Sequence, residues 1–455
     1  MKEEVNPPSR RTFIKAAGIS ALSGVTIPHV FADSSETLQV AIVGTGGRGG
    51  GAAAQALSVP HPTKMVAMAD VFEDKLNRSF EALSHKMRNT PEKMDVPEER
   101  RFLGFDAYKK AMDCLRPGDI VILTTPPAFR WVHFKYAIEK GLNVFMEKPV
   151  TVDGPSSKRM LELAVLADKK GLKCGVGLMV RHCKGRIELH DRIQSGEIGD
   201  ITMMRAYRMH GPVGSAFTEK KPEGIPEVMH QVKRFHSFLW ASGGLFNDFY
   251  IHQIDETCWM KNAWPVKAHA LGGRHYKKDF VDQNFDTYSV EYTFEDGTKL
   301  FFNGRTMLRA HTDMSSKVHG TKGSAVVSAA GHHPGKVATF KGHEMSREAR
   351  LWAVPQPEEN PYQLEWDHLV HAIVNDIPYN EVVRGVMASQ VCNMGRMSAH
   401  TGTEVTFEQS FDCDHEFAPD LEHLTVDGPA PLPPFDDGTY PIPAPGITKK
   451  REYMI

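Results

Sequence analysis

The chain has 455 residues, of which 41% are hydrophobic and 24% charged, and its formal net charge is −2. This length is enough for two ordinary domains and a tail, with a sizeable core. The near-neutral charge gives no reason to expect binding to nucleic acid or to an anionic membrane surface. The six cysteines form no CxxC pair and the 22 histidines are scattered, so we expect neither a disulfide framework nor a metal site.

The first 32 residues are typical of an export signal. The segment Ser9-Arg10-Arg11-Thr12-Phe13-Ile14-Lys15 matches a twin-arginine motif. Residues 16–28 are too short and too weakly apolar a run to span a bilayer stably. Small residues in Val30-Phe31-Ala32 predict cleavage before Asp33. We therefore expect a periplasmic or otherwise exported protein that folds before it leaves the cytoplasm.

Residues 33–178 predict a first domain of α/β class. Short apolar runs predict strands at 38–43, 65–69, 120–123, 144–146 and 172–178. Helices are expected at 52–57, from the turn at 124–127 to Lys140, and at 155–170. Such alternation favours a doubly wound parallel sheet with helices on both faces, a Rossmann fold.

The loop after the first strand carries the pattern GxGxxG, as Gly44-Thr45-Gly46-Gly47-Arg48-Gly49. Its glycines allow a tight turn, close approach of a pyrophosphate, and close packing of helix on strand. Asp70 ends the next strand, where an acid binds the ribose of NAD and repels the 2′-phosphate of NADP. Arg48 could instead meet a phosphate, so NADP stays the alternative cofactor.

Residues 179–405 predict a second, α+β domain. Strands are expected at 201–209, 266–273, 286–294, 298–308 and 324–328, forming a large antiparallel sheet, with helices at 184–195, 248–261 and 362–375. Residues 406–455 lose this periodicity, and 427–446 hold seven prolines. We expect an extended tail that wraps the body.

Two segments carry candidate chemistry. Glu147-Lys148-Pro149 follows a predicted strand of the parallel sheet, where ligands bind, and a buried lysine there can orient or deprotonate a hydroxyl. Asp248 and His252 are four residues apart on a predicted helix, and Asp255 falls on the same face. A carboxylate beside an imidazole makes a proton acceptor, although such a pair is often only structural.

Taken together, these pieces resemble the Gfo/Idh/MocA oxidoreductase superfamily over about residues 38–405. The matching segments are the glycine loop, Thr125-Pro126-Pro127, Ala137 to Gly141, Asn143 to Pro149, Gly177 to Arg181, Gly196 to Ile201, the Asp248/His252 segment, Val318 to Gly323, Tyr362 to Glu365, Asn380-Glu381 and Gly395-Arg396.

The resemblance implies catalytic roles for Lys148, Asp248 and His252, with His252 as the acid/base. Thr125, Pro126, Arg130 and Glu147 complete the expected cofactor-binding set. Arg130 stands where the family often has a histidine, so we expect it to contact the cofactor or an anionic group. The apolar Leu245-Phe246-Asn247 before the acidic residue is a second departure, and both leave the substrate open.

Three functions fit these observations. The first is an oxidoreductase that moves hydride between a sugar or cyclitol hydroxyl and tightly bound NAD, in a homo-oligomer. The second is a glycoside hydrolase or lyase that oxidises its sugar transiently and returns the electrons, which suits a compartment without cofactor recycling. The third is a non-catalytic sugar-binding protein, against which the complete Lys148, Asp248 and His252 set argues.

Overall fold

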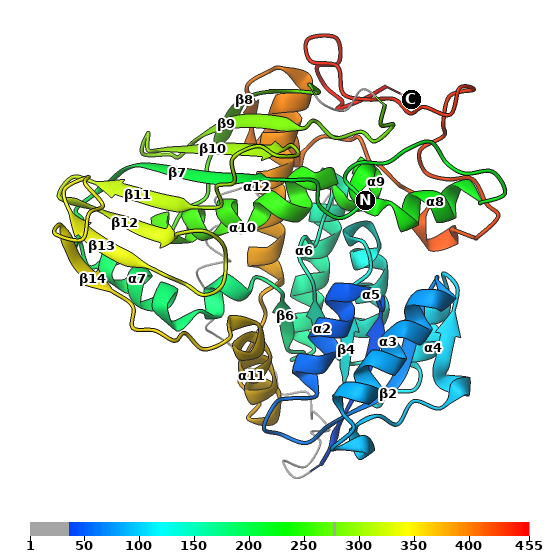
Figure 1. Ribbon diagram of the computed structural model, residues 1–455. Coiled ribbons are helices and arrows are strands. Elements are labelled where there is room, and N and C mark those ends of the chain that lie inside the picture. The colour runs from blue at the N-terminus through cyan, green and yellow to red at the C-terminus, as the bar shows by residue number, and fades with distance from the viewer. Residues whose placement is uncertain (1–35, 276–278, 455) are drawn as a thin grey trace, which may run out of the picture.

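The computed structural model describes residues 36–275 and 279–454, and the predicted export signal lies outside these residues. Two sheets dominate the molecule. A six-stranded sheet forms the blue and cyan domain of Figure 1, and a nine-stranded sheet forms the green and yellow domain beside it. The fold is therefore of the α/β class with two sheet domains, as predicted.

The first sheet has the strand order β3-β2-β1-β4-β5-β6, and every pair is parallel. Its strands are β1 Leu38–Val43, β2 Thr63–Asp70, β3 Arg101–Leu103, β4 Ile120–Leu123, β5 Asn143–Met146 and β6 Cys174–Val176. The helices between them are α2 Gly47–Ala56, α3 Glu73–Lys86, α4 Ala107–Met112, α5 Arg130–Glu139 and α6 Gly154–Lys169. This order reverses direction between β1 and β4, where doubly wound folds bind ligands.

One predicted boundary is wrong in this domain. Helix α2 begins at Gly47, inside the glycine loop, and not at residue 52. Because Gly47 and Gly50 sit in the first turn, local helix propensity is poor there, and packing against the sheet decides the start. The strand β3 and the helices α3 and α4 were not predicted individually.

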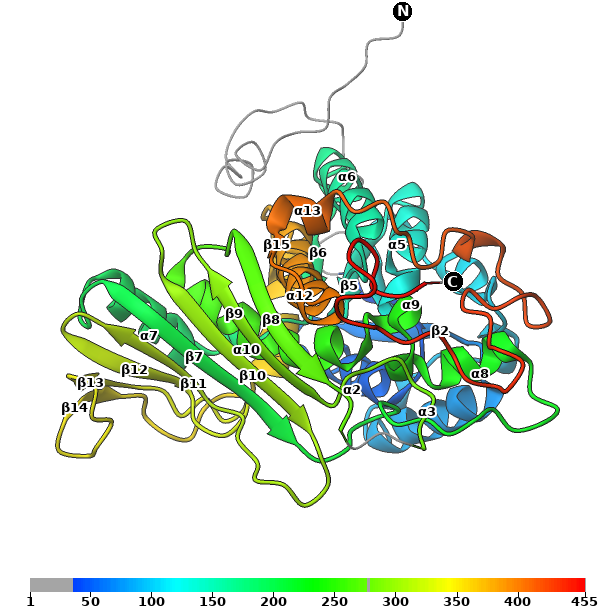
Figure 2. The same cartoon turned by 90° about the horizontal axis from the view of Figure 1, so that it is seen from above.

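The second sheet has the order β14-β13-β12-β11-β7-β10-β9-β8-β15. Its strands are β7 Ile201–His210, β8 Lys267–Gly273, β9 Thr287–Thr293, β10 Lys299–Thr306, β11 Ser316–Gly320, β12 Gly323–Ser328, β13 Ala338–Lys341, β14 Arg350–Ala353 and β15 Val405–Thr406. Most pairs are antiparallel as predicted, but β7 and β10 run parallel, so the sheet is mixed. Figure 2 shows α7 (Lys184–Gln194) and α10 (Gly244–Lys261) against one face.

The remaining helices join the two domains. They are α8 Glu227–Lys233, α9 Leu239–Ser242, α11 Pro361–Val374, α12 Val382–Thr401 and α13 Phe407–Phe411, with short 3₁₀ turns at Met179–His182 and Phe235–Ser237 among others. Helix α12 is buried on nearly every side and packs against α6, α10 and β8. It thereby connects the first domain to the helix expected to carry the acid–base residues.

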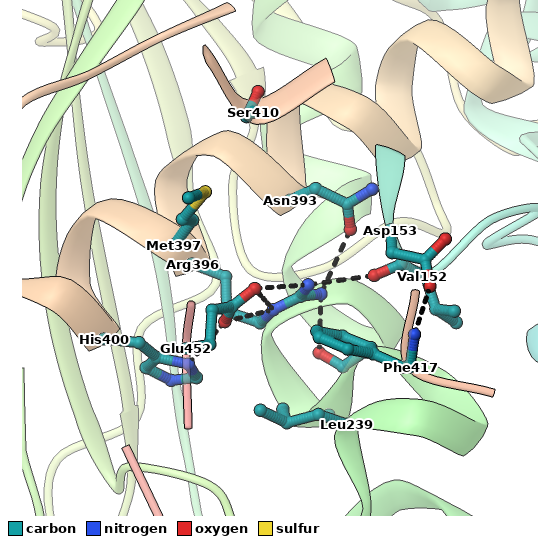
Figure 3. Close-up of polar contacts among 12 residues, drawn as sticks. Val152, Asp153, Leu239, Asn393, Arg396, Met397, His400, Ser410, Phe417 and Glu452 are labelled. Carbon is teal, nitrogen blue, oxygen red and sulfur yellow. Dashed lines mark hydrogen bonds and ion pairs between the residues drawn. The ribbon is translucent and has the colours of Figure 1, made fainter. Parts of the chain in front are cut away.

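The tail after α13 runs along the body without long helices or strands (Figure 2), and it also contributes to the core. Leu432, Tyr440 and Tyr453 are buried. Figure 3 shows how the end of the tail inserts the Glu452 carboxylate beside the guanidinium of Arg396 on α12. The expectation of a purely extended segment was therefore incomplete, because side chains at three separate places in the tail are buried in the interior.

Candidate functional site

A cavity of about 950 Å³ opens at the carboxyl ends of the first sheet and extends to α10 of the second domain. All the predicted site residues except Asp255 line it. These are Gly44, Gly46, Gly47, Arg48, Gly49, Asp70, Thr125, Pro126, Arg130, Glu147, Lys148, Asp248 and His252. The parallel sheet gathers the loops after β1, β2, β4 and β5 at one edge, as a doubly wound fold requires.

The glycine loop has the geometry of a phosphate cradle. Gly44 has a φ of +95°, which favours glycine, and a Cβ on Gly49 would clash with the Gly44 carbonyl oxygen. A Cβ on Gly46 or Gly47 would meet no protein atom within 4 Å. The first and third glycines therefore serve the turn and the helix packing. The middle ones leave the backbone open to a ligand at the N-terminus of α2.

Asp70 ends β2 and holds this loop. Its Oδ2 accepts hydrogen bonds from the Thr45 backbone N–H at 2.7 Å and from the Thr45 hydroxyl at 3.0 Å, and its Oδ1 accepts from the Phe72 N–H at 2.9 Å. The side chain is only partly buried and borders the cavity. It is placed both to fix the loop and to meet a bound ligand.

Arg130 begins α5, its guanidinium reaches the carboxyl end of β4, and it is almost fully buried. Its two terminal nitrogens donate to the carbonyl oxygens of Leu123 and Thr125, the latter at 2.9 Å. Burial lowers the pKa of Arg130 to about 10, against the opposing charges of Glu147 and Asp248. Its guanidinium thus stabilises the Thr125-Pro126 turn, and both residues of this turn line the cavity.

Glu147 and Arg48 form an ion pair across the cavity floor. Arg48 Nε lies 2.7 Å from Glu147 Oε1, and Arg48 Nη2 donates to Gln55 Oε1 at 2.7 Å. The Arg48 guanidinium also lies over the Tyr362 ring of α11 at 4.8 Å. These contacts draw the Arg48 side chain toward α11, while its backbone stays in the glycine loop.

Lys148 and Asp248 meet directly. Lys148 Nζ donates to the Asp248 backbone oxygen at 2.5 Å and lies 3.6 Å from its carboxylate Oδ1. The other oxygen, Oδ2, lies 3.2 Å from His236 Nε2. Although burial raises the pKa of Asp248, the Lys148 ammonium and the His236 hydrogen bond lower it to about 2 overall. Asp248 therefore stays ionised and keeps Lys148 oriented in the cavity.

His252 faces the cavity one helical turn beyond Asp248. Burial lowers the pKa of His252 well below its usual value, and the neighbouring His332, Lys148, Arg208 and Arg48 lower it further. Its Nδ1 is buried without a hydrogen-bond partner. The imidazole is therefore neutral, with a nitrogen able to exchange a proton with a bound ligand.

The expectation that Asp255 belongs to the same cluster is wrong. Asp255 is fully buried away from the cavity, and Arg181 binds its carboxylate through two nitrogens at 2.7 and 3.0 Å. Less than one turn beyond His252, this side of α10 no longer borders the cavity. Asp255 thus serves an ion pair between α10 and the 3₁₀ turn Met179–His182.

Three residues of the site were missed from the sequence: His236, Arg208 and His332. His236 comes from a 3₁₀ turn, and its Nδ1 accepts from the Ser215 N–H at 3.2 Å, so its Nε2 carries the hydrogen that points to Asp248. Arg208 and His332 come from the end of β7 and from the loop after β12. None of these positions has a local motif that would reveal it.

A buried polar cluster, drawn in Figure 3, contacts the chain near both the Glu147-Lys148-Pro149 segment and the start of α10. Arg396 donates to the Val152 carbonyl oxygen at 2.9 Å, just after the Glu-Lys-Pro segment. It also donates to Gly243 O at 3.2 Å and to Asn247 Oδ1 at 2.7 Å, at the start of α10. Glu452 supplies the counter-charge for Arg396. The relative position of Lys148 and α10 therefore depends on this cluster.

Comparison with known proteins identifies the family. The model described as "Oxidoreductase family, NAD-binding Rossmann fold" matches residues 38–178, and the model described as "GFO/IDH/MocA C-terminal domain" matches residues 187–326. Together the two cover more than half of the chain. The chain belongs to the Gfo/Idh/MocA oxidoreductase family. This membership confirms the predicted family and its cofactor, NAD.

Individual Gfo/Idh/MocA relatives are distant. The scyllo-inositol 2-dehydrogenase (NAD(+)) of Bacillus subtilis is 27% identical over 241 residues, which are 52% of this chain and 62% of that protein. The chain thus aligns with less than two thirds of this relative's length. The solved aldose-aldose oxidoreductase of Caulobacter crescentus, complexed with glycerol, is 17% identical with a TM-score of 0.62, covering 82% of this chain and 100% of that one.

A scyllo-inositol dehydrogenase of Lactobacillus casei, solved with NAD(H) and scyllo-inositol bound, is 21% identical with a TM-score of 0.58, over 82% of this chain and 99% of that one. At these identities the two structures establish the shared fold.

Residues 36–275 and 279–454 contain neither a metal-binding cluster nor a membrane-spanning helix. Within them no three His, Cys, Asp or Glu side chains are grouped to hold a metal ion. Among the helices of the same residues, none is long and apolar enough to cross a membrane.

Proposed function

We propose that this Gfo/Idh/MocA protein is an exported, NAD-dependent oxidoreductase acting on a hydroxyl-bearing carbon of a sugar or cyclitol. The observation that carries the proposal is the arrangement of the cavity. Lys148, Asp248 and His252 converge in the same space that the glycine loop opens for a dinucleotide. The curated inositol dehydrogenase relative supports the choice of substrate class.

In this reaction, His252 and Lys148 act on the substrate hydroxyl, and Asp248 and His236 position Lys148. His252 is neutral and accepts the hydroxyl proton, while the Lys148 ammonium donates a hydrogen bond to the same oxygen. Asp248 holds Lys148, and His236 fixes the Asp248 carboxylate. The backbone amides of Gly46 and Gly47, at the N-terminus of α2, would hold the pyrophosphate. Bound NAD would supply the acceptor for the hydride that leaves the carbon.

A second candidate is redox-neutral cleavage of a glycoside through transient oxidation. The twin-arginine segment Arg10-Arg11 favours it, because an exported enzyme would have to regenerate its cofactor within its own cycle. Oxidation of one carbon acidifies the neighbouring C–H, elimination breaks the glycosidic bond, and the electrons return to the sugar. The same proton-transfer residues would serve both reactions.

One experiment separates these functions. The cofactor that co-purifies is identified by mass, and the protein is then incubated with cyclitols, aldoses and glycosides while reduced nicotinamide and released sugar are followed. Net reduced cofactor supports the dehydrogenase, and glycoside cleavage without net reduction supports the second candidate. Failure of all substrates with cofactor bound would contradict both. Lys148→Met, which should bind cofactor but not turn over, is the control for contaminating activity.

Export and assembly are tested separately. Replacing Arg10 and Arg11 by lysine should keep the protein in the cytoplasm, and unaffected export would remove the twin-arginine argument.

We also expect a homo-oligomer, which light scattering of the purified protein measures; a monomer at micromolar concentration would contradict it.

A further inference from the structure

Arg208 is half-buried in the cavity wall, and among the described residues no carboxylate lies within ion-pair distance of its guanidinium. In the described part of the chain, buried arginines are paired with acids as Arg181–Asp255, Arg186–Glu256 and Arg396–Glu452, whereas Arg130 binds carbonyl oxygens. Arg208 Nη1 bonds to His332 Nε2 at 2.6 Å, and its Nε is buried without a partner. A partly buried charge without a counter-ion is unfavourable, so such a residue is expected to meet an anion when the site is filled.

Arg208 and His332 lie in the cavity beside the proton-transfer residue. The ring centroids of His332 and His252 are 4.1 Å apart, close enough for one sugar ring to contact both residues. Because His332 Nε2 accepts from Arg208, its Nδ1 carries the hydrogen, and this nitrogen is buried without a partner. The pair therefore offers two unused donors, one on each side chain.

The acids near this pair are already engaged. Asp248 is held by Lys148 and His236, and Glu256 accepts from Ser328 and lies 3.4 Å from Arg186. Burial lowers the pKa of Arg208, and Asp248 and Glu256 only partly oppose that effect. The substrate end of the cavity thus carries a positive charge that described side chains leave uncompensated.

We propose that Arg208 and His332 bind an anionic substituent of the substrate, a carboxylate or a phosphate ester, so that the protein acts on charged rather than neutral sugars. This inference rests on the proposed function and specifies its substrate class. Arg208 supplies the charge and a planar donor face, and His332 Nδ1 supplies a second hydrogen bond. The anion then fixes which hydroxyl of the sugar reaches His252.

The test compares charged and neutral sugars of the same configuration. Binding is measured by calorimetry with glucuronate, glucose 6-phosphate and glucose, and kcat/KM is measured with each. The wild type should prefer at least one anionic sugar, and which one it prefers distinguishes a carboxylate from a phosphate. Arg208→Gln should reduce that preference by about 10- to 100-fold, the range expected for a hydrogen bond to a charged group. Arg208→Lys should restore part of it.

Arg205→Gln is the matched control. Arg205 lies on the same strand and also bonds to a histidine, His319 Nε2 at 3.2 Å, but it does not line the cavity. It should leave the preference unchanged, and an unfolding midpoint measured for each variant separates lost binding from lost folding. Equal binding of charged and neutral sugars by the wild type, or an equal preference in wild type and Arg208→Gln, would overturn the inference.

Measuring sugar binding and turnover separately tells whether the anion site or the proposed reaction is wrong. Charged sugar that binds through Arg208 without any cofactor reduction or glycoside cleavage would support the anion site and contradict the proposed reaction. Turnover of neutral sugars alone would support the reaction and contradict the anion site.

Discussion

Replacing Glu452 by glutamine should destabilise the whole protein, although the residue lies three positions from the end of the chain. Both Glu452 oxygens are used: Oε1 and Oε2 each lie 2.9 Å from an Arg396 nitrogen, and His400 Nδ1 lies 2.7 Å from Oε2. The Arg396 side chain is 1% exposed and that of Glu452 7%. Removing the carboxylate charge leaves a guanidinium buried without its counter-ion.

The magnitude follows from the pKa of Glu452. Burial raises this pKa, but the Arg396 charge and the hydrogen bonds from His400 and Arg396 lower it from 4.5 to about 2. A shift of that size corresponds to about 3 kcal/mol of stability at pH 7. Breaking a buried ion pair typically costs about 3–5 kcal/mol, which agrees. Because the folded-state pKa is depressed, this stability is present above the unfolded pKa and is lost as the pH falls toward 2.

Urea unfolding of wild type and Glu452→Gln at several pH values measures this contribution. The difference in the free energy of unfolding should be about 3 kcal/mol at pH 7 and less than about half of that near pH 3. Glu416→Gln is the matched control in the same tail. Its partner Arg159 is 36% exposed, and such pairs contribute about 0–1 kcal/mol. A Glu452→Gln variant as stable as Glu416→Gln, or a difference independent of pH, would refute the argument.

Three further predictions concern the cavity. His252→Ala should lower kcat by about 10²–10⁴-fold with cofactor content and unfolding midpoint unchanged, because it removes the proton acceptor; near-normal turnover would move that role elsewhere. Asp70→Ala should narrow the ratio of NADP to NAD dissociation constants in fluorescence titrations, and a wild type that prefers NADP would contradict the assigned role. Gly49→Ala should cost about 1–3 kcal/mol in urea unfolding, because its Cβ meets the Gly44 carbonyl oxygen, whereas Gly46→Ala should fold normally and lose only cofactor affinity; equal stability of the two would contradict this packing.

The first domain was largely predictable because its signals are local. The run Ile120–Leu123 is apolar throughout and is a strand of the buried parallel sheet, with the predicted bounds. The glycine loop and the acid ending β2 lie at a fixed spacing along the chain. The cavity position then follows from the parallel topology, since the carboxyl ends of the strands share one edge.

Helix α12 was missed because its residues are buried on nearly all sides. A helix facing solvent shows a polar stripe with a period of 3.6 residues, but Val382–Thr401 has buried polar residues such as Gln390, Asn393 and Arg396 mixed with apolar ones. Their partners come from distant segments, so the local pattern carries no signal. The strands β13 and β14 have four residues each, too few to show the alternation of apolar and polar residues that predicts a strand.

The site was predictable only where one segment carries it. Lys148, Asp248 and His252 stand in recognisable segments, whereas His236, Arg208 and His332 enter the cavity from a turn, a strand end and a loop. Helical spacing also placed Asp255 in the cluster, but the next turn of α10 already packs against Arg181. Spacing specifies a helix face, and only tertiary packing decides how much of that face borders the cavity.

The most direct test of the central claim is the fate of the carbon-bound hydrogen. The purified protein with its own cofactor is mixed, in a single turnover, with an inositol or a sugar acid deuterated at its ring carbons, and the cofactor is then released and weighed by mass spectrometry. The account predicts reduced nicotinamide carrying one deuterium in the wild type and none in Lys148→Met. Substrate that turns over while the cofactor stays free of deuterium would contradict it.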